Sequence, residues 1–392
     1  PHDESGTDVT DAPAAARSPL SGWPLIFGVG AVVALVVMVV LIAKGPSSGD
    51  GGVGALERDA LTLGVQDDQL ASAPVSDLTG RLDRIAATGV AGTRVEVAWA
   101  DVASAKPADA RNPDDPAYSW QRTDAVFDGL RKHGIRAIVV FSASPGWANG
   151  NLGREWAPDP AAFGDFVHAF ATRYRADPAE IIAYEPWNEP NNPGYLMPQW
   201  EGVGTAAEPA SPTVYAELAS KARNAISGTG AALIGPSTAD IASSAPGVGG
   251  VSVSDFVTAL VGAKPRPHFD AVAQHLQPQA GDASTTRVPS LEALPKLLSL
   301  YDRLASGRDL FITRISYATA PGGMTFDQQS SALQDAVAAL FADQCLDNAD
   351  GAAFVLRALE RRPAGPPVEA ATGGEMLVAS AKRAFGDLLY RK

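Results

Sequence analysis

Two short segments hold the residues whose types could do acid–base chemistry. The first, YEPWNEPN at residues 184–191, places Glu189 close to Trp187. A carboxyl group beside an indole in a partly apolar mouth is kept protonated by desolvation, and a protonated carboxyl can act as a general acid on a glycosidic oxygen. The alternative is an exposed loop carboxylate, and these residues alone leave both interpretations open.

The second segment is FITRISYAT at residues 311–319, where an apolar run meets polar residues at Arg314. A guanidinium has no lone pair with which to attack a carbon atom, and it stays charged in proteins. A cation within ~4–6 Å of Glu189 would lower the pKa of that carboxyl by ~1–3 units and leave it ionised. The chemistry therefore depends on whether the fold brings the two segments together.

Both segments lie in a chain of alternating strand-like and helix-like stretches. Eight apolar runs, each followed by a helical stretch, are expected as strands: residues 61–65, 92–99, 136–142, 181–189, 231–237, 269–276, 310–316 and 351–358. Such strands need cover on both faces, and eight βα units predict an α/β fold, a (β/α)8 TIM barrel. A doubly wound sheet is less favoured, because no Gly-rich phosphate loop opens the first helix. In a barrel, chemistry lies at the C-terminal strand ends, where Glu189 and Arg314 fall.

The region before the barrel divides into three parts. Residues 23–43 carry no charge, and 21 residues at ~1.5 Å each span roughly 30 Å, so we expect a single transmembrane helix that binds the lipid bilayer. A cleaved signal peptide or a buried core helix is the alternative, but the run exceeds a ~7–15 residue signal core. Residues 1–22 are expected as a disordered tail, residues 44–58 as a flexible linker and residues 59–392 as the barrel.

Charge and cysteine content limit the partners. The chain has 392 residues and a formal net charge of −13, which would repel a phosphate backbone, so nucleic acid is excluded as a partner. The single cysteine, Cys345, has no Cys or His pattern around it, so we expect a core thiol and neither a metal site nor a cofactor. Arg17 precedes the apolar run and Lys44 follows it, so the distribution of positive charges says little about the orientation of the run in the membrane. We expect a single-pass cell-membrane protein with an extracytoplasmic barrel.

The segment YEPWNEPN at the end of a fourth strand resembles the acid/base motif of retaining glycoside hydrolases with (β/α)8 barrels, the clan of cellulases, β-xylosidases and α-iduronidases. The likeness covers most of residues 61–392. GTRVEVAWADV, VVFSASPGWAN, FDAVAQHL and LFITRISY are similar to the clan's second, third, sixth and seventh strands. The resemblance implies that Glu189 is the acid/base and that Asn188 holds the sugar 2-hydroxyl. The expected substrate-binding residues are Asn188, Arg94, Trp99, Trp147, Trp187, His275 and Tyr317.

The seventh strand departs from the clan at the nucleophile. The clan pattern is Thr, Glu, an apolar residue, Gly and an aromatic, whereas this chain reads Thr313, Arg314, Ile315, Ser316 and Tyr317. Retaining hydrolysis needs two carboxyl groups ~5–5.5 Å apart, so hydrolysis should be impaired or lost. Neighbouring strand ends also depart: Leu276 and Gln277 follow His275, no tryptophan ends the eighth strand, and Pro186 interrupts the fourth.

Three functions remain open. The first is a membrane-anchored pseudoenzyme that binds a cell-envelope or extracellular polysaccharide, with the tryptophans above and Trp200 as stacking surfaces. In it Arg314 either receives an acidic glycan or only neutralises Glu189 and Glu185. The second is an active O-glycosyl hydrolase that pairs Glu189 with Asp68, Glu96 or Asp327. The third is a non-catalytic scaffold of a membrane complex. In all three, Arg94 and Glu185 should form a structural ion pair inside the barrel.

Overall fold

A computed structural model of the chain describes residues 33–40, 62–90, 92–175, 181–241, 243–276, 294–305, 310–317 and 352–360. The predicted tail (1–22) and linker (44–58) lie outside the described residues, and the first described residue of the predicted barrel region (59–392) is Thr62. Cys345, Asp327 and Gln277 also lie outside them.

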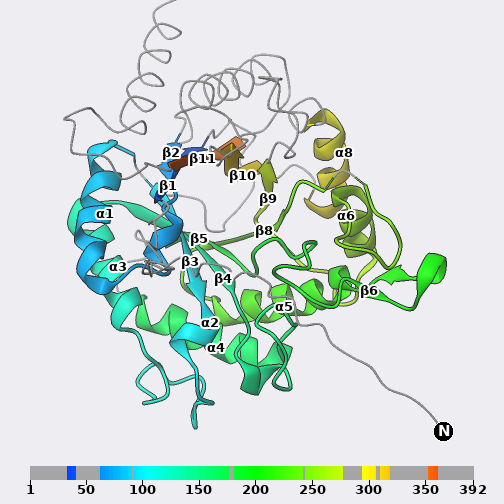
Figure 1. The fold of residues 1–392 in the computed structure, drawn as a ribbon, viewed down its shortest axis with the longest axis horizontal. Helices are drawn as coiled ribbons and strands as arrows, with labels where there is room; N and C mark the ends of the chain where they lie inside the picture. The colour runs from blue at the N-terminus through cyan, green and yellow to red at the C-terminus, as the bar shows by residue number, and fades with distance from the viewer. Residues whose placement is uncertain are drawn as a thin grey trace, which may run out of the picture. The chain divides into compact units, whose positions relative to one another are not determined.

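Nine of the described strands form a closed barrel, and eight of them run parallel to one another, which confirms the predicted α/β fold with a curled parallel sheet (Figure 1). All eight predicted strands are present, as β2 (Thr62–Val65), β3 (Gly92–Ala98), β4 (Arg136–Ser142), β5 (Ile181–Glu185), β8 (Ala232–Thr238), β9 (Ala271–Leu276), β10 (Leu310–Tyr317) and β11 (Ala352–Glu360). Neighbouring strands pair in parallel, and Val355 of β11 pairs with Gly64 of β2 to close the ring. The C-terminal strand ends therefore meet at one face.

Helices between the strands cover the outside of the barrel. They are α1 (Val75–Ala87), α3 (Gln121–His133), α4 (Pro160–Arg173), α5 (Ser211–Ala225), α6 (Val253–Gly262) and α8 (Leu294–Ala305). Local sequence sets their ends: Asp159 accepts a hydrogen bond from the amide of Ala162 at 2.8 Å and Pro160 opens α4, whereas α3 stops at Gly134, which has a φ of +64°.

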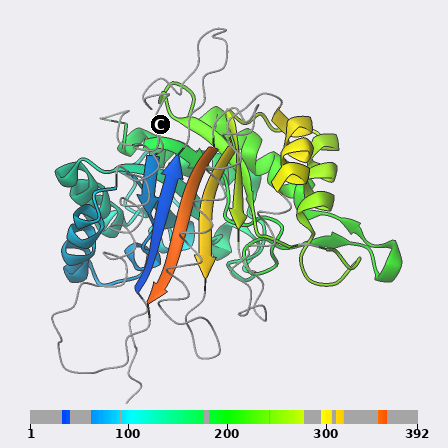
Figure 2. The same cartoon turned by 90° about the horizontal axis from the view of Figure 1, so that it is seen from above.

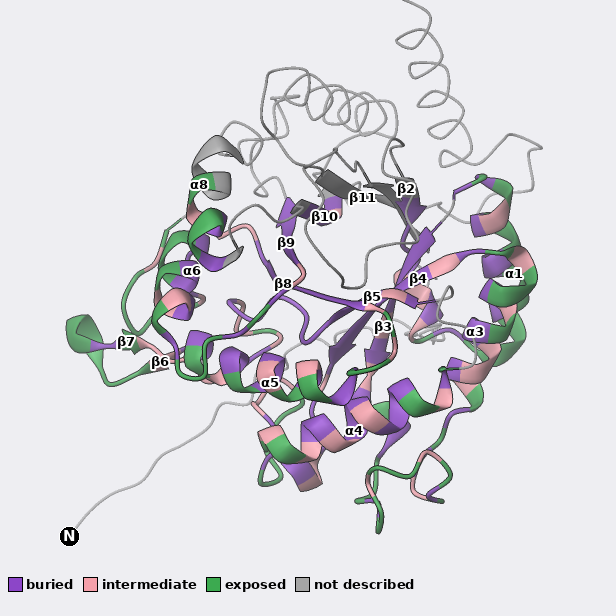
Figure 3. Cartoon of the chain, turned by 180° about the vertical axis from the view of Figure 1, so that it is seen from behind, coloured by how far each residue is buried: buried purple, intermediate pink, exposed green. Residues whose placement is uncertain are grey.

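The core lies between the strands and the inner faces of the helices (Figure 3). Phe163, Phe166 and Phe170 of α4 are fully buried, and Phe141 of β4 packs edge-on against all three. Exposed residues occupy the outward helix faces in the same view. This packing holds the strands rigidly enough to place side chains at their ends.

Part of the predicted transmembrane helix, residues 23–43, forms a strand instead. Val33–Val40 form β1, which pairs antiparallel with β11 and with β2 (Figure 2). A continuous apolar run rich in valine has no periodicity that separates helix from strand, and β-branched residues favour strands. The other residues of the predicted span lie outside the described ranges, and none of the helices that the structure describes is long and apolar enough to cross a bilayer.

The fourth barrel strand is shorter than predicted. We expected residues 181–189 with Pro186 inside the strand, but β5 ends at Glu185. Proline has no N–H to donate to the ladder, so the strand stops before it. The chain then turns, and the amide of Asn188 donates to the carbonyl of Phe141 at 3.1 Å. Glu189 consequently lies in the loop above the strand end.

Candidate active site

Strained backbone marks three strand ends at the C-terminal face. Glu189 follows β5 with a φ of +41°, Ala143 follows β4 with +61°, and Ser237 near the end of β8 has +54°. Non-glycine residues rarely adopt a left-handed φ, and such residues cluster at functional sites. Since β4, β5 and β8 are neighbours in the barrel, the strain lies where the sequence predicts chemistry.

Arg314 reaches this face through an irregularity in β10. The register shifts between Ile312 and Arg314 against β9, and between Ile312 and Ile315 against β11. A bulge of this kind re-aims a side chain. Arg314 is in register with His275 of β9, so these two residues come from adjacent strands toward the same point.

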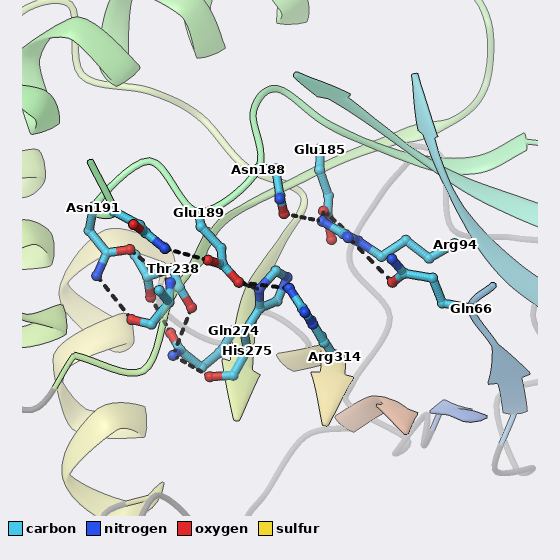
Figure 4. A network of polar contacts seen from close by, with 12 residues as sticks. Gln66, Arg94, Glu185, Asn188, Glu189, Asn191, Thr238, Gln274, His275 and Arg314 are labelled. Atoms are coloured by element: carbon cyan, nitrogen blue, oxygen red, sulfur yellow. Dashed lines mark hydrogen bonds and ion pairs between the residues drawn. The ribbon is translucent and has the colours of Figure 1, made fainter. Parts of the chain in front are cut away.

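The carboxylate of Glu189 is held by three side chains, and Figure 4 shows its contacts with His275 and Arg314. Its Oε1 lies 3.0 Å from Nη1 of Arg314 and 2.9 Å from Nδ1 of His275. Its Oε2 accepts a hydrogen bond from Nδ2 of Asn192 at 2.8 Å. Glu189 is 2% exposed, so the structure brings the two predicted residues, Glu189 and Arg314, into a direct buried contact.

These contacts determine the charge of Glu189. Burial alone would raise the pKa of this carboxyl, but the hydrogen bond and charge of His275, the charge of Arg314 and the hydrogen bond from Asn192 lower it to about 2. Glu189 is thus ionised at neutral pH. A general acid needs the opposite shift.

His275 contacts the same oxygen of Glu189 as Arg314 does. Burial lowers the pKa of His275; its hydrogen bond to Glu189 opposes the shift, and the charge of Arg94 adds to it. A neutral imidazole beside an ionised carboxylate donates from Nδ1, which leaves Nε2 as an acceptor. Nε2 is buried and has no hydrogen-bond partner among the described residues.

The predicted ion pair between Arg94 and Glu185 is confirmed. Nε of Arg94 donates to Oε2 of Glu185 at 2.9 Å, and neither side chain has exposed surface. Nη2 of Arg94 also donates to Oδ1 of Asn188 at 2.9 Å, and Nη1 reaches Oε1 of Gln66 at 3.4 Å. Asn188, expected to hold a sugar hydroxyl, is therefore 1% exposed and turned toward Arg94.

The tryptophans differ from the expectation of stacking surfaces. Trp99 and Trp187 are 0% exposed. Trp99 stacks on Phe166 of α4 with ring centroids 5.1 Å apart, and Nε1 of Trp187 donates to the carbonyl of Tyr195 at 2.8 Å. Both rings pack in the core under the helix layer, so neither presents a face to a ligand.

Two other tryptophans keep some exposed surface. Nε1 of Trp147 donates to the carbonyl of Ala103 at 2.8 Å, and Nε1 of Trp200 donates to the carbonyl of Gly249 at 2.9 Å. Both are half-buried against the core. Only the backbone of Tyr317 is described, at the end of β10.

The alternative carboxylates lie near the site. Burial raises the pKa of Asp68, which follows β2, and the charge of Arg314 and a hydrogen bond from Gln66 at 2.6 Å oppose that shift. Glu96 on β3 accepts a hydrogen bond from Oγ of Ser142 at 2.6 Å. Within the described ranges, no three His, Cys, Asp or Glu side chains are grouped to hold a metal ion.

Two residues of the site, Asn192 and Tyr195, were not predicted from the sequence. Nδ2 of Asn192 donates to Oε2 of Glu189, and the charge of Arg314 acts on the hydroxyl of Tyr195. Asn192 sits three positions after Glu189, and its amide also donates to the carbonyl of Glu189 at 2.9 Å, which is a turn contact that the spacing could have suggested. Tyr195 lies in an irregular loop that carries no periodic signal.

No protein-family model and no curated protein matches the sequence. Among solved structures, the chain is similar to an endo-1,4-beta-mannanase from Rhizomucor miehei at 10% identity, over 78% of this chain and 88% of that one, with a TM-score of 0.46. It is similar to a glucosidase from Croceicoccus marinus at 13% identity, over 76% of this chain and 59% of the other, with a TM-score of 0.48. A GH39 enzyme from Xanthomonas axonopodis pv. citri is 16% identical, over 65% and 50% of the two chains, with a TM-score of 0.43. The chain spans only 59% and 50% of the length of the last two, and likeness at this level assigns it neither a family nor an activity.

Proposed function

We propose that this barrel binds a glycan, from the cell envelope or an extracellular polysaccharide, and that it hydrolyses glycosidic bonds weakly or not at all. The observation that carries the proposal is the 3.0 Å contact between Arg314 and Glu189 at the C-terminal face. The glycan part is supported by the resemblance of the segment at residues 184–191 to a sugar-cleaving motif.

The contact removes both partners that retaining hydrolysis requires. Arg314 stands where the attacking carboxylate would be, and a guanidinium cannot attack the anomeric carbon. Its charge, with His275 and Asn192, keeps Glu189 without the proton that a leaving group needs. A ligand can therefore be held at this face without being cleaved.

The test uses the full chain with purified envelope and extracellular polysaccharides. Co-sedimentation should show binding, while a reducing-end assay on the same mixture should show no release of sugar. Binding to none of the polysaccharides would overturn the proposal. So would release of reducing ends at a rate that scales with the concentration of the native chain.

A hydrolase that uses Asp68 is the second candidate, favoured by one observation. Burial raises the pKa of Asp68, as a general acid requires, and the ionised Glu189 could then serve as a base. An inverting pair needs its carboxyl groups ~6.5–9.5 Å apart, with water between them. Sugar release by the native chain that Asp68→Asn abolishes would favour this candidate.

We also propose that residues 23–43 anchor the chain in the cell membrane, with the barrel on the extracytoplasmic side. The support is the uncharged run of 21 residues in the sequence. Val33–Val40 cannot form strand β1 and part of a membrane-spanning helix at the same time, so one molecule can adopt only one of these two structures. A scaffold in a membrane complex would need the same anchor.

A further inference from the structure

The position of a sugar ring on the barrel axis is occupied by protein. In a retaining site the ring sits between two carboxyl groups ~5–5.5 Å apart. Here the guanidinium of Arg314 lies 3.0 Å from the carboxylate of Glu189, and Asn192 and His275 take the remaining acceptor directions. A glycan that binds at this face must lie beside this pair rather than within it.

A hollow of about 310 Å³ opens at the ends of β3 and β4. Glu96 of β3 and Ser142 at the end of β4 line it from the barrel, and Arg154 and Glu155 line it from the loop after β4. Tyr195 lines it as well, and because the charges of Glu189 and Arg314 both act on the Tyr195 hydroxyl, the hollow lies near that pair.

A second hollow of about 400 Å³ continues from the first. Both are lined by the same five residues, which are Ala71, Ser72, Glu96, Ala98 and Asp101. Beyond them the second hollow runs over the ends of β3 and α3. The two together give space for more than one sugar unit outside the barrel axis.

The charged side chains that line the first hollow disfavour glycans that carry carboxylates. Arg154 is paired with Asp101 at 2.8 Å, whereas Glu96 and Glu155 have no cationic partner among the described residues. Arg314, which lies near the first hollow, is neutralised by Glu189, and Arg122, which lines the second hollow, donates from Nη1 to the carbonyl of Ala73. A carboxylate placed here would face like charges, whereas hydroxyl or amine groups would find oxygen acceptors and the hydroxyls of Ser142 and Tyr195.

We propose that the glycan binds in these joined hollows at the ends of β3 and β4, and that its units carry hydroxyl or amine groups and no carboxylate. The inference rests on the proposed function, because it specifies where the glycan lies and of which class it is. Of the two sequence-based alternatives for Arg314, it favours neutralisation of Glu189 over receipt of an acidic glycan, since the arginine that would receive a carboxylate is already paired.

The test compares hexamers of glucosamine, glucose and galacturonate on the full chain by calorimetry. The glucosamine and glucose hexamers should bind more tightly than the galacturonate hexamer. Ser72 is exposed and lines both hollows, so Ser72→Trp should fill them and weaken binding by about tenfold or more, equivalent to ~1.4 kcal/mol. Ser76→Trp is the matched control, because Ser76 is exposed and outside the hollows, and it should bind as the native chain does.

A charge variant tests the class of ligand separately. Glu96→Gln should weaken the glucosamine hexamer more than the glucose hexamer, because only the amine gains from the carboxylate. Tightest binding of galacturonate, or unchanged affinity in Ser72→Trp, would overturn this inference while leaving glycan binding in place. Failure of every hexamer and of the envelope polysaccharides would overturn the proposed function and this inference together.

Discussion

Nη1 of Arg314 lies 3.0 Å from Oε1 of Glu189, although the two residues are 125 positions apart in the sequence. The contact joins the loop after β5 to the end of β10, across one strand-end face of the barrel. Together with the stronger effect of His275, it keeps the carboxylate ionised, and it neutralises the guanidinium at the same time. Stability, pH response and catalytic behaviour should all reflect this contact.

Glu189 should make stability depend on acid pH. Its pKa of about 2 in the folded chain lies below ~4.3, the ordinary value of an unfolded glutamate. The stabilisation from the ionised group is therefore complete above pH ~4.3 and is lost as the pH falls toward 2, and it amounts to ~3 kcal/mol. Glu189→Gln should lower stability at pH 7 and flatten the pH dependence between these limits.

Urea unfolding at a series of pH values measures this effect. Glu201→Gln is the matched control, because Glu201 is exposed on β6 (Trp200–Glu201), and it should keep the native pH dependence. An unchanged slope in Glu189→Gln between pH 2 and 4.3 would show that Glu189 is not held by these donors.

The ion pair of Arg94 and Glu185 should be costly to break. Arg94→Met leaves Glu185 charged and fully buried, with its Oε1 already unpartnered among the described residues, so unfolding should be easier by ~3–5 kcal/mol. Arg94→Met combined with Glu185→Leu removes both charges and should recover a large part of this loss. Denaturant melts of Arg94→Met, of Glu185→Leu and of the double variant measure these losses. If the loss in the double variant equals the sum of the two single losses, the result would argue against the pair.

The sequence predicted features that depend on burial and chain order. Eight apolar runs sufficed for the eight strands, because a strand covered on both faces must be continuously apolar. Arg94 and Glu185 were predictable as a pair, because two opposite charges that point into a barrel cannot stay apart. The position of Arg314 followed from the strand pattern once the strand ends were known.

Features that depend on loop paths were not predictable. Trp99 and Trp187 follow strand ends, but the loops turn both rings inward against α4 and away from any ligand. Tyr195 comes under the charge of Arg314 from an irregular loop without a sequence signal. The run at Val33–Val40 was ambiguous for another reason, because an uncharged β-branched segment suits both a membrane helix and a strand.

A membrane-extraction experiment should distinguish a membrane helix at residues 23–43 from the strand at Val33–Val40. If residues 23–43 form the anchor, the full chain should stay with the membrane after alkaline carbonate extraction, and protease added to intact cells should release the barrel. Release into the carbonate supernatant would instead place Val33–Val40 with the barrel as β1. A barrel protected from protease until the cells are broken would reverse the proposed orientation.

The central claim is that Arg314 removes hydrolysis from this barrel, and turnover of aryl β-glycosides tests it most directly. Arg314→Glu restores two facing carboxyl groups, and their repulsion should raise the pKa of Glu189 toward that of an acid. Arg314→Gln is the matched control, because it removes the charge without supplying a nucleophile. We expect no turnover by the native chain or by Arg314→Gln, and measurable turnover by Arg314→Glu. Robust turnover by the native chain, abolished by Asp68→Asn, would contradict the account.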